Sequence, residues 1–218
     1  HPMRKVLAGA RYAAFRSGPL TIAAGTAGAF FKTDPRLASP DIQIHFIPFS
    51  TDKMGEKLHT FSGFTASVCQ LRPESRGSLR IRSADPAAPP EIRINYLASE
   101  TDRRANIDGL RALRKILAAP ALKPYVSDEA YPGSKVVSDD DILAYCRQTG
   151  STIYHPTSTC RMGTDALAVV DQRLRVRGID GLRVVDASIM PDLVSGNTNA
   201  PVIMIAEKAS DMILQDGR

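Results

Sequence analysis

The sequence predicts an α+β protein, in which an antiparallel sheet of about five or six strands carries helices on one face. Two observations lead to this fold class. Segments in which apolar and polar residues alternate with a period of two follow one another in the first half of the chain. Segments with helical periodicity, introduced by helix-capping residues, dominate the second half. The alternation of apolar and polar residues in the first half favours an antiparallel sheet with one face on the core and the other in water.

The first half of the chain contains a predicted helix and several predicted strands. The helix covers residues 4–15, and a loop rich in Gly, Ala and Thr follows it to about Pro40. The strands are predicted over residues 41–46, 64–71, 77–82 and 91–95. In the last two, apolar residues alternate with basic ones, which predicts an apolar face on the core and a basic face in water. The proline-rich residues 85–90 between them indicate a loop.

Capping boxes predict two helices in the second half of the chain. Residues 99–102 (Ser-Glu-Thr-Asp) open the first helix, in which apolar residues recur at helical spacing until Pro120 ends it. Residues 138–141 (Ser-Asp-Asp-Asp) open the second helix, which Gly150 ends. Basic residues lie on a separate face of the first helix, and we interpret that face as solvated surface.

A hairpin and a last helix complete the predicted elements. Two short strands, residues 174–176 and 182–185, surround residues 178–181 (Gly-Ile-Asp-Gly), a spacing typical of a hairpin. The last helix is predicted from near Pro201 to about Leu214, because proline is favoured in the first helical turn.

The composition describes a globular protein and argues against a nucleic-acid or membrane-spanning function. Hydrophobic residues make up 43% and charged residues 23% of the 218 residues, which suffices for a core. The net charge is +5, but the basic residues are scattered and no aromatic residues alternate with them, which argues against a nucleic-acid groove. The most apolar early run, residues 20–31, falls short of the roughly 18 apolar residues that span a bilayer.

The cysteines indicate a reducing compartment. The sequence has three widely spaced cysteines and no Cys-x-x-Cys motif. They are Cys69, Cys146 and Cys160. This pattern predicts free thiols, with neither a disulfide framework nor a zinc site. We therefore expect a cytoplasmic location, with association to the inner face of the membrane as a second expectation.

Four polar residues near the C-terminus are candidates for a functional site on residue type alone. His155 lies in a dense polar loop, and histidine is a residue type suited to proton transfer, although a lone histidine is more often structural. Asp186 follows a strand, where ligand-binding residues and turn-forming aspartates both occur. Asn197 and Asn199 precede the last helix, where they either cap it or border a helix N-terminus that binds an anion. These alternatives stay open on the residues alone.

Three segments in the last third of the chain carry a resemblance to a known family. They are YHPTSTCRMG at residues 154–163, DGLRVVDASIMP at residues 180–191 and SGNTNAP at residues 195–201. In order and spacing they resemble the C-terminal signature of the glucose-methanol-choline (GMC) oxidoreductases, and RPESRG at residues 72–77 resembles the substrate-domain strand of that family. Their detailed forms are similar to the choline dehydrogenase and alkanol dehydrogenase branch. Ser158 departs from the family pattern, which often has glycine there.

The resemblance implies an FAD-dependent oxidation of a primary alcohol to an aldehyde, with hydride transfer to the flavin N5. His155 matches the active-site histidine of the family, which orients the alcohol and helps to remove its hydroxyl proton. Asn197 matches the second active-site position, which is histidine in some members and asparagine in others. The implied partners are a small alcohol substrate and a quinone or respiratory-chain acceptor.

The resemblance also implies which residues meet FAD. Asn199 and Pro201, at the start of the last helix, match the contact to the flavin N1–C2 carbonyl edge, where a positive helix end stabilises developing negative charge. Asp186 and Ala187 match residues near the ribityl-phosphate portion of the cofactor. The resemblance implies no metal site.

The resemblance also predicts the domain organisation. Residues 1–150 are expected to form the substrate-binding domain, and residues 151–218 the active-site loops and C-terminal helix, a fragment of the FAD-binding domain. The Gly-x-Gly-x-x-Gly motif for the ADP half of FAD does not occur in this sequence, so we expect the N-terminal dinucleotide-binding segment to be missing. Part of residues 151–200 is then expected to be disordered or repacked in the isolated chain, and exposed apolar surface to favour a homodimer.

Two alternatives to a flavin enzyme follow from the residues. The first is a folded, non-catalytic module that does not bind FAD on its own. The second is a serine hydrolase that uses Ser158 or Ser188 with His155 and Asp186. The Gly-x-Ser-x-Gly elbow is absent, and the order of these residues has no strand-turn-helix context, so the sequence disfavours the hydrolase.

Overall fold

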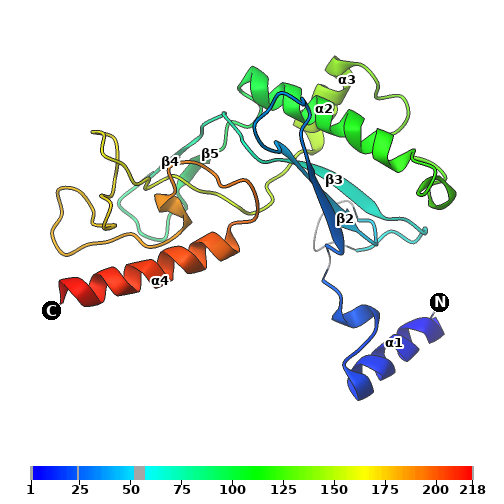
Figure 1. Ribbon diagram of the computed structural model, residues 1–218, viewed down its shortest axis with the longest axis horizontal. Coiled ribbons are helices and arrows are strands. Elements are labelled where there is room, and N and C mark those ends of the chain that lie inside the picture. The colour runs from blue at the N-terminus through cyan, green and yellow to red at the C-terminus, as the bar shows by residue number, and fades with distance from the viewer. Residues whose placement is uncertain (1, 24, 52–56, 218) are drawn as a thin grey trace.

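The computed structural model describes residues 2–23, 25–51 and 57–217, and its elements fall into two groups with a separate N-terminal helix (Figure 1). The first group is a sheet of three strands with two helices on one side. The second group contains a two-stranded ribbon, long loops and the C-terminal helix. The helices are α1 (Pro2–Phe15), α2 (Glu100–Leu117), α3 (Asp139–Thr149) and α4 (Asn199–Asp216). The strands are β1 (Ala27–Phe31), β2 (Ile42–Ile47), β3 (Thr65–Gln70), β4 (Ser78–Arg80) and β5 (Glu91–Arg93).

The larger sheet has the order β1–β2–β3, and both pairs are antiparallel, so β2 is the central strand. Ile42 and Ile44 of β2 are buried, and Ile42 faces α2. Because side chains alternate along a strand, Gln43 and His45 lie on the opposite face of the sheet. The strands predicted over residues 41–46 and 64–71 are confirmed as β2 and β3.

β1 lies in the segment that the sequence predicts as a loop to about Pro40, and that prediction is wrong. The strand pairs with β2 along its whole length. Gly28 approaches β2 so closely that a Cβ there would lie 2.8 Å from the carbonyl oxygen of Ile44. Small residues permit this approach but give little apolar periodicity, which is why the pattern did not reveal a strand.

Helix α2 packs on β2 and β3 through a glycine. A Cβ on Gly109 would lie 2.7 Å from Cγ1 of Val68, so the helix reaches this position only without a side chain there. The buried residues of α2 are Asp102, Ala105, Ile107, Gly109 and Leu113. Ser99 caps the helix by accepting a hydrogen bond from the N–H of Asp102. The second half of the predicted capping box is not formed, because the Asp102 carboxylate binds the backbone of residues 74–75 instead.

Helix α3 packs on α2 and begins at the predicted capping box, which is complete between Ser138 and Asp141. Ile142 in its first turn is fully buried. Arg104 of α2 binds Asp139 of α3, with Nη1 and Oδ2 2.7 Å apart. The predicted helix is therefore confirmed, and Gly150 follows its last residue.

Strands β4 and β5 pair antiparallel as a separate ribbon. In the described residues the strands therefore divide into three and two, and the expected single sheet of five or six strands is not formed. The apolar side chains of the ribbon are exposed, at 50% for Leu79 and 63% for Ile92, and Ile81, directly after β4, is 91% exposed. The expectation that this face lies on the core is wrong, because these apolar side chains are largely exposed among the described residues.

Helix α4 and the loops after residue 160 share a second hydrophobic core. Its buried members are Val170, Leu174, Ile189, Met190, Ile205 and Ala209. The predicted hairpin is reduced to an isolated bridge between Arg175 and Arg183, with Gly178 and Gly181 at positive φ in the turn. The last predicted helix is confirmed as α4, which begins slightly earlier than Pro201.

Three arginines hold the C-terminal end of α4. The carboxylate of Asp216 binds the guanidinium groups of Arg173, Arg175 and Arg183. These hydrogen bonds hold the pKa of Asp216 far below its usual range, and the bond from Arg175 has the largest effect. The end of the helix is thereby attached to the hairpin turn.

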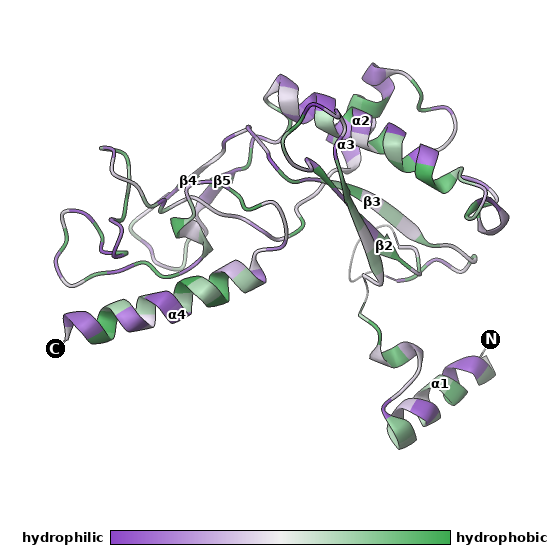
Figure 2. Ribbon diagram, in the orientation of Figure 1, coloured by the Kyte–Doolittle hydropathy of each residue, from purple (hydrophilic) through white to green (hydrophobic). Residues whose placement is uncertain are grey.

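Apolar residues occur along both α1 and α4 (Figure 2), and several of their side chains are exposed. They are Met3, Val6, Leu7 and Phe15 on α1, and Ile203, Met204, Ile213 and Leu214 on α4. Helix α1 packs on the short turn η1 (Pro19–Thr21) and stands apart from the sheet (Figure 1). In the described part of the chain, no helix has both the length and the apolar character needed to cross a membrane.

Candidate active site

His155 and Asn197, the two residues predicted to be catalytic, lie in contact. Nδ2 of Asn197 is 2.8 Å from Nε2 of His155. The other ring nitrogen, Nδ1, lies 2.8 Å from Oγ1 of Thr198. Both nitrogens of His155 therefore have a partner, and two consecutive residues before α4 fix the orientation of the ring.

The polar face of β2 borders this pair. Nε2 of Gln43 donates a hydrogen bond to Oδ1 of Asn197 at 3.3 Å. His45 lies on the same face of the strand. Burial lowers the pKa of His45, and positive charge on nearby His155 lowers it further. A largely neutral imidazole at this position therefore lies near His155.

The loop that carries His155 contains two non-glycine residues in the left-handed backbone region. Tyr154 has a φ of 64° and Ser158 a φ of 74°. This conformation costs a non-glycine residue about 1–2 kcal/mol. It explains why a glycine suits the position of Ser158, and strain of this kind concentrates at functional sites.

Asp186 and Ala187 belong to a turn that is attached to the same loop. The carboxylate of Asp186 accepts a hydrogen bond from the N–H of Ser188 at 2.7 Å and so caps the 3-10 helix η3 (Ala187–Ile189). The carbonyl of Ser188 accepts a hydrogen bond from the N–H of Cys160 at 3.0 Å. The structure thus gives Asp186 the turn-capping role, and its contact with a cofactor stays a prediction.

Asn199 and Pro201 lie in the first turn of α4, whose N-terminus has no side-chain cap. The N-cap residue is Thr198, and its hydroxyl contacts His155 instead of the helix. The N–H groups of Asn199 and Ala200 have no partner in the described part of the chain, and both residues are exposed. An open helix N-terminus beside His155 presents partial positive charge to an anion.

The alternative in which Asn197 or Asn199 caps the last helix is wrong. Asn197 uses its side chain on His155 and Gln43, and Asn199 is already the first residue of the helix. Thr198 stands at the cap position between them.

Sequence reasoning missed three residues of the site: Gln43, His45 and Thr198. A signal for Gln43 was present, because a polar residue at the centre of an apolar strand, here only 7% exposed, requires a polar partner. The same alternation assigns His45 to that face. Thr198 lies inside the family-like segment at residues 195–201, but its type gave no indication of a contact with His155.

The hydrolase arrangement does not form. Both nitrogens of His155 are engaged by Thr198 and Asn197, and no hydrogen bond joins His155 to Ser158 or Ser188 in the described residues. Ser158 instead contacts the neighbouring hydroxyl of Thr157. These residues therefore do not make a catalytic triad.

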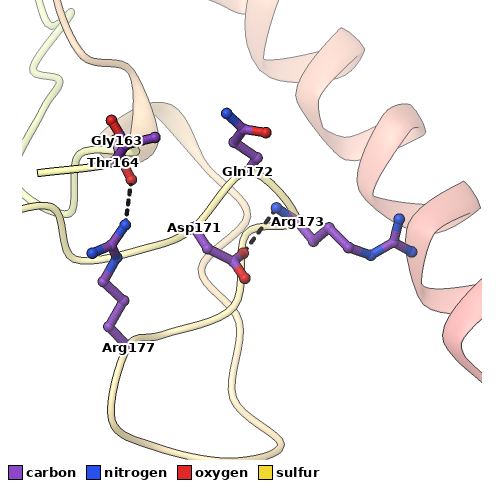
Figure 3. Close-up of a pocket in the computed structure, with 6 residues that line it drawn as sticks. All are labelled: Gly163, Thr164, Asp171, Gln172, Arg173 and Arg177. Atoms are coloured by element: carbon purple, nitrogen blue, oxygen red, sulfur yellow. Dashed lines mark hydrogen bonds between the residues drawn. The ribbon is translucent and has the colours of Figure 1, made fainter.

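A hollow of about 400 Å³ lies elsewhere, among the loops after residue 160, and no residue of the His155 site lines it. Its polar groups already hold the loops together: Arg177 donates to the carbonyl of Gly163 at 2.7 Å, and Asp171 accepts from the N–H of Arg173 at 2.8 Å (Figure 3). The guanidinium of Arg173 points away from the hollow toward α4 (Figure 3). The hollow is therefore a product of loop packing, and the candidate site remains at His155.

The described residues provide neither a metal cluster nor a disulfide. In residues 2–23, 25–51 and 57–217, no three His, Cys, Asp or Glu side chains are arranged to hold a metal ion. The three cysteines are free and half-buried, and burial raises the pKa of the Cys69 and Cys146 thiols.

Comparison with known proteins places this site in a family. Residues 73–206, more than half of the chain, match the family model described as GMC oxidoreductase. An alcohol dehydrogenase [acceptor] of Pseudomonas putida is 45% identical over 200 residues, which cover 92% of this chain and 36% of the relative. An oxygen-dependent choline dehydrogenase of Yersinia pseudotuberculosis is 45% identical over 187 residues, which cover 86% of this chain and 33% of the relative.

Solved structures agree in fold. The pyridoxine 4-oxidase from Mesorbium loti superimposes with a TM-score of 0.77 at 31% identity, over 84% of this chain and 36% of that chain. A formate oxidase variant from Aspergillus oryzae RIB40 gives a TM-score of 0.87 over 97% of this chain and 42% of that chain. At 24% identity, the second similarity supports the fold alone.

The chain spans about a third of the length of the curated relatives that it matches. The match of the family model includes the His155 loop, η3 and the start of α4, whereas β2, which carries Gln43 and His45, lies outside it. This chain therefore belongs to the GMC oxidoreductase family.

Proposed function

We propose that this chain supplies the substrate side of an FAD-dependent enzyme that oxidises a primary alcohol to an aldehyde. One observation carries the proposal: His155 and Asn197 are in contact beside the open N-terminus of α4. The names of the relatives support the substrate class, since they include an alcohol dehydrogenase and a choline dehydrogenase.

The residues around His155 fit a flavin. The N–H groups of Asn199 and Ala200 are exposed and have no partner among the described residues, so the helix end can receive the electron-rich edge of the ring system. Asn199 and Pro201 would hold that edge, and Asp186 and Ala187 would lie toward the ribityl-phosphate portion. When bound, the flavin supplies the acceptor for the hydride that leaves the alcohol carbon.

His155 is the proposed base for the alcohol hydroxyl. Its Nε2 is in direct contact with Nδ2 of Asn197, so the alcohol hydroxyl would displace this contact, give its proton to Nε2 and accept a hydrogen bond from Nδ2. Because Thr198 holds Nδ1, the ring cannot turn away while the proton moves. Fixing both groups before the substrate arrives removes the entropic cost of aligning them.

The strand residues close the other side of the site. Gln43 and His45 form a polar surface on β2 opposite the face that α2 covers. The lowered pKa of His45 keeps its imidazole neutral when a positive charge forms on His155. The surface therefore adds hydrogen-bonding capacity without a second positive charge.

The domain division at about residue 150 is part of this proposal. The remaining two thirds of the length of the relatives would provide the dinucleotide-binding segment, and the exposed apolar sides of α4 and the ribbon suit contact with it. We further propose a quinone or respiratory-chain acceptor, as the family resemblance implies; the name of the Pseudomonas putida relative gives an acceptor without specifying it.

The test is a pair of variants in the full-length protein that contains this chain. His155→Gln should retain flavin absorption and lower kcat with a primary alcohol by about 100-fold or more, because an amide cannot take the proton. Lys115→Ala, at an exposed position of α2, is the control and should retain both the flavin absorption and the wild-type kcat. Wild-type activity in His155→Gln would refute the proposal.

A second measurement separates the enzyme from the non-catalytic module. The purified chain is mixed with FAD, passed through gel filtration and examined by visible absorption. Retained flavin bands would mean that this chain holds the cofactor by itself. Loss of the flavin would mean that the isolated chain is a folded module and that catalysis needs the full-length protein.

A further inference from the structure

One buried hydroxyl joins the His155 loop to the start of α4. Oγ1 of Thr198 lies 2.8 Å from Nδ1 of His155, and Thr198 is 7% exposed. The two residues are 43 positions apart, so the contact attaches a loop to a helix and is not part of a local turn. The carbonyl of Thr198 also accepts a hydrogen bond from the N–H of Val202 at 3.0 Å, in the first turn of α4. The ring of His155 is therefore attached directly to the start of the helix.

Helix α4 is a firmer support than the loop that carries His155. Its residues Ile205 and Ala209 are buried in the second hydrophobic core. The loop has left-handed backbone at Tyr154 and Ser158, and Tyr154 is 74% exposed. Because side chains on regular elements hold their partners more precisely than side chains on loops do, Thr198 gives His155 the rigidity of the helix.

The contact with Thr198 is also the one that remains when a substrate binds. The described residues give the His155 ring two hydrogen-bonding partners, Asn197 at Nε2 and Thr198 at Nδ1. The alcohol hydroxyl has to displace the contact between Asn197 and Nε2 in order to reach Nε2. The hydrogen bond at Nδ1 lies on the other side of the ring, so it can hold the ring throughout the proton transfer.

A hydroxyl group suits this task better than a carboxylate or an amide nitrogen would. It donates and accepts, so it can pair with Nδ1 in either tautomer of neutral His155 and again after the ring has taken a second proton. It also carries no charge. The open N–H groups of Asn199 and Ala200 therefore keep their partial positive charge, which a carboxylate at position 198 would offset.

We propose that Thr198 is a positioning residue that holds His155 in a fixed place relative to the open N-terminus of α4. The hydroxyl proton of the alcohol moves to Nε2 of His155, the hydride leaves the alcohol carbon for the flavin, and the C–O single bond becomes a C=O double bond. Both acceptors must be aligned on one C–O unit, and Thr198 joins the proton acceptor to the helix end that would receive the flavin. The catalytic part of this role rests on the proposed function, whereas the attachment of the ring does not.

The attachment can be measured in this chain without flavin or alcohol. The chain contains four histidines, so carbon-13 labelling of histidine gives few ring signals, and those of His155 are the ones that His155→Gln removes. Relaxation of the ring carbons gives their order parameter. The wild-type value for His155 should be close to that of rigid backbone, about 0.85. A wild-type ring with an order parameter below about 0.6 would overturn the proposal before any variant is made.

The first substitution removes the hydroxyl and keeps the branched shape of the side chain. In Thr198→Val the order parameter of the His155 ring should fall below about 0.6, and Thr198→Ser, which restores a hydroxyl, should return it to the wild-type value. Thr198→Ala gives the same test if valine prevents folding. A folded Thr198→Val or Thr198→Ala chain that retains the wild-type order parameter would overturn the proposal.

The matched control is Thr149→Val in α3. It also removes a threonine hydroxyl that makes a hydrogen bond of 2.8 Å, in this case to the carbonyl of Tyr145. The control should leave the order parameter of the His155 ring unchanged. An equal loss of order in Thr149→Val and Thr198→Val would mean that the effect is not specific to Thr198 and would overturn the proposal.

Kinetics of the full-length protein with FAD test the catalytic part. Thr198→Val should lower kcat for a primary alcohol by about 10- to 100-fold with little change in KM, and Thr198→Ser should recover most of that loss. Flavin absorption should stay at the wild-type level, because the open N–H groups of α4 belong to the backbone. Loss of flavin from a folded Thr198→Val protein would overturn the proposal, since the cofactor and not the base would then be displaced.

The failure of the proposal and that of the proposed function give different results. A less ordered ring in Thr198→Val, together with a full-length wild-type protein that oxidises no alcohol, would refute the proposed function and leave the attachment of His155 to α4 intact. A less ordered ring together with a wild-type kcat in Thr198→Val would refute the role of Thr198 in catalysis.

Discussion

The carboxylate of Asp102 accepts a hydrogen bond from the backbone N–H of Ser75 at 2.9 Å, which attaches the first turn of α2 to the loop after β3. The same carboxylate accepts from the N–H of Glu74 and from the side chain of Gln70, each at 2.8 Å. Asp102 is 2% exposed, so the carboxylate is a buried anchor between the helix and the segment that leads to the β4–β5 ribbon.

Asp102→Asn should lower the free energy of unfolding by about 2–4 kcal/mol, because the amide nitrogen faces a backbone N–H that it cannot accept from. Urea unfolding measures the change. Asp211→Asn, an exposed position on α4, serves as the control and should change stability little. Equal stability of the two variants would mean that the anchor contributes nothing.

The contribution of Asp102 should also depend on pH. Burial alone raises the pKa of its carboxyl, but the hydrogen bonds from Ser75, Glu74 and Gln70 outweigh burial and hold the pKa below the usual value. Because the pKa is lower in the folded state, the ionised carboxylate stabilises the fold at pH values above the unfolded pKa of about 3.9. This stabilisation is lost as the pH falls through the folded pKa. The difference between the wild type and Asp102→Asn should therefore shrink below about pH 4.

Gly109→Ala should destabilise the chain by about 1 kcal/mol, although alanine is the better helix former. The added Cβ would lie 2.7 Å from Cγ1 of Val68 and 3.1 Å from Cδ1 of Ile42, which forces α2 away from the sheet. Gly9→Ala in α1 is the matched control, since no atom lies within 4 Å of its added Cβ, and it should increase helicity. Thermal unfolding and circular dichroism distinguish the two effects.

Substitutions at Ser158 should follow the backbone conformation. Ser158→Gly relieves the left-handed strain and should stabilise the chain by about 0.5–1 kcal/mol, whereas the β-branched Ser158→Val should destabilise it by about 1 kcal/mol or more. Ser151→Val, an exposed position where φ is not positive, is the control. Similar melting temperatures for both valine variants would argue against strain at this position.

The pH dependence of the stability of the fold near neutrality should come partly from His45. Burial lowers the pKa of His45, and charge on His155 lowers it further. The contribution of His45 to stability is therefore complete above the unfolded pKa of about 6.5, and it falls as the pH decreases toward the folded pKa. A proton-detected NMR titration should place the midpoint of His45 below 6.5, and His155→Gln should raise that midpoint. A midpoint that His155→Gln leaves unchanged would mean that the two rings do not interact.

Hydrogen exchange should reveal how far residues 151–200 depend on the rest of a longer protein. We expect their amides to exchange faster in this chain alone than in the full-length protein, because apolar side chains of this segment, among them Tyr154, Leu167 and Ile179, are exposed here. Amides of α2 should exchange at similar rates in both, since its core is internal to this chain. Equal protection of residues 151–200 in both proteins would contradict the expectation.

The sequence predicted elements whose signals are local. The capping residues Ser99 and Ser138 lie directly before the helices that they start, so α2 and α3 were readable from a few neighbouring residues. β1 was missed because its existence depends on a partner strand that follows much later in the chain. The ribbon was predicted as strands, but its alternating residues could not show that the layer to cover them is absent from the described chain.

The candidate site was predicted only as far as family resemblance reached. His155 and Asn197 lie in segments that resemble a signature, and the structure brings their side chains together. The link to Gln43 had no counterpart in any motif, because it joins a strand to a loop at the far end of the chain. Asp186 was assigned a cofactor contact by resemblance, whereas its visible role is local turn capping.

The hydrogen bond between Gln43 and Asn197 spans 154 positions of the chain. Contacts of such separation form late, because the entropy of closing a long loop must be lost before the contact stabilises anything. The contact between His155 and Asn197 spans 42 positions, so it closes a much shorter loop than the contact between Gln43 and Asn197. We therefore expect the sheet to meet the start of α4 late in folding, so that the polar face of β2 joins the site after the His155 loop and Asn197 have met.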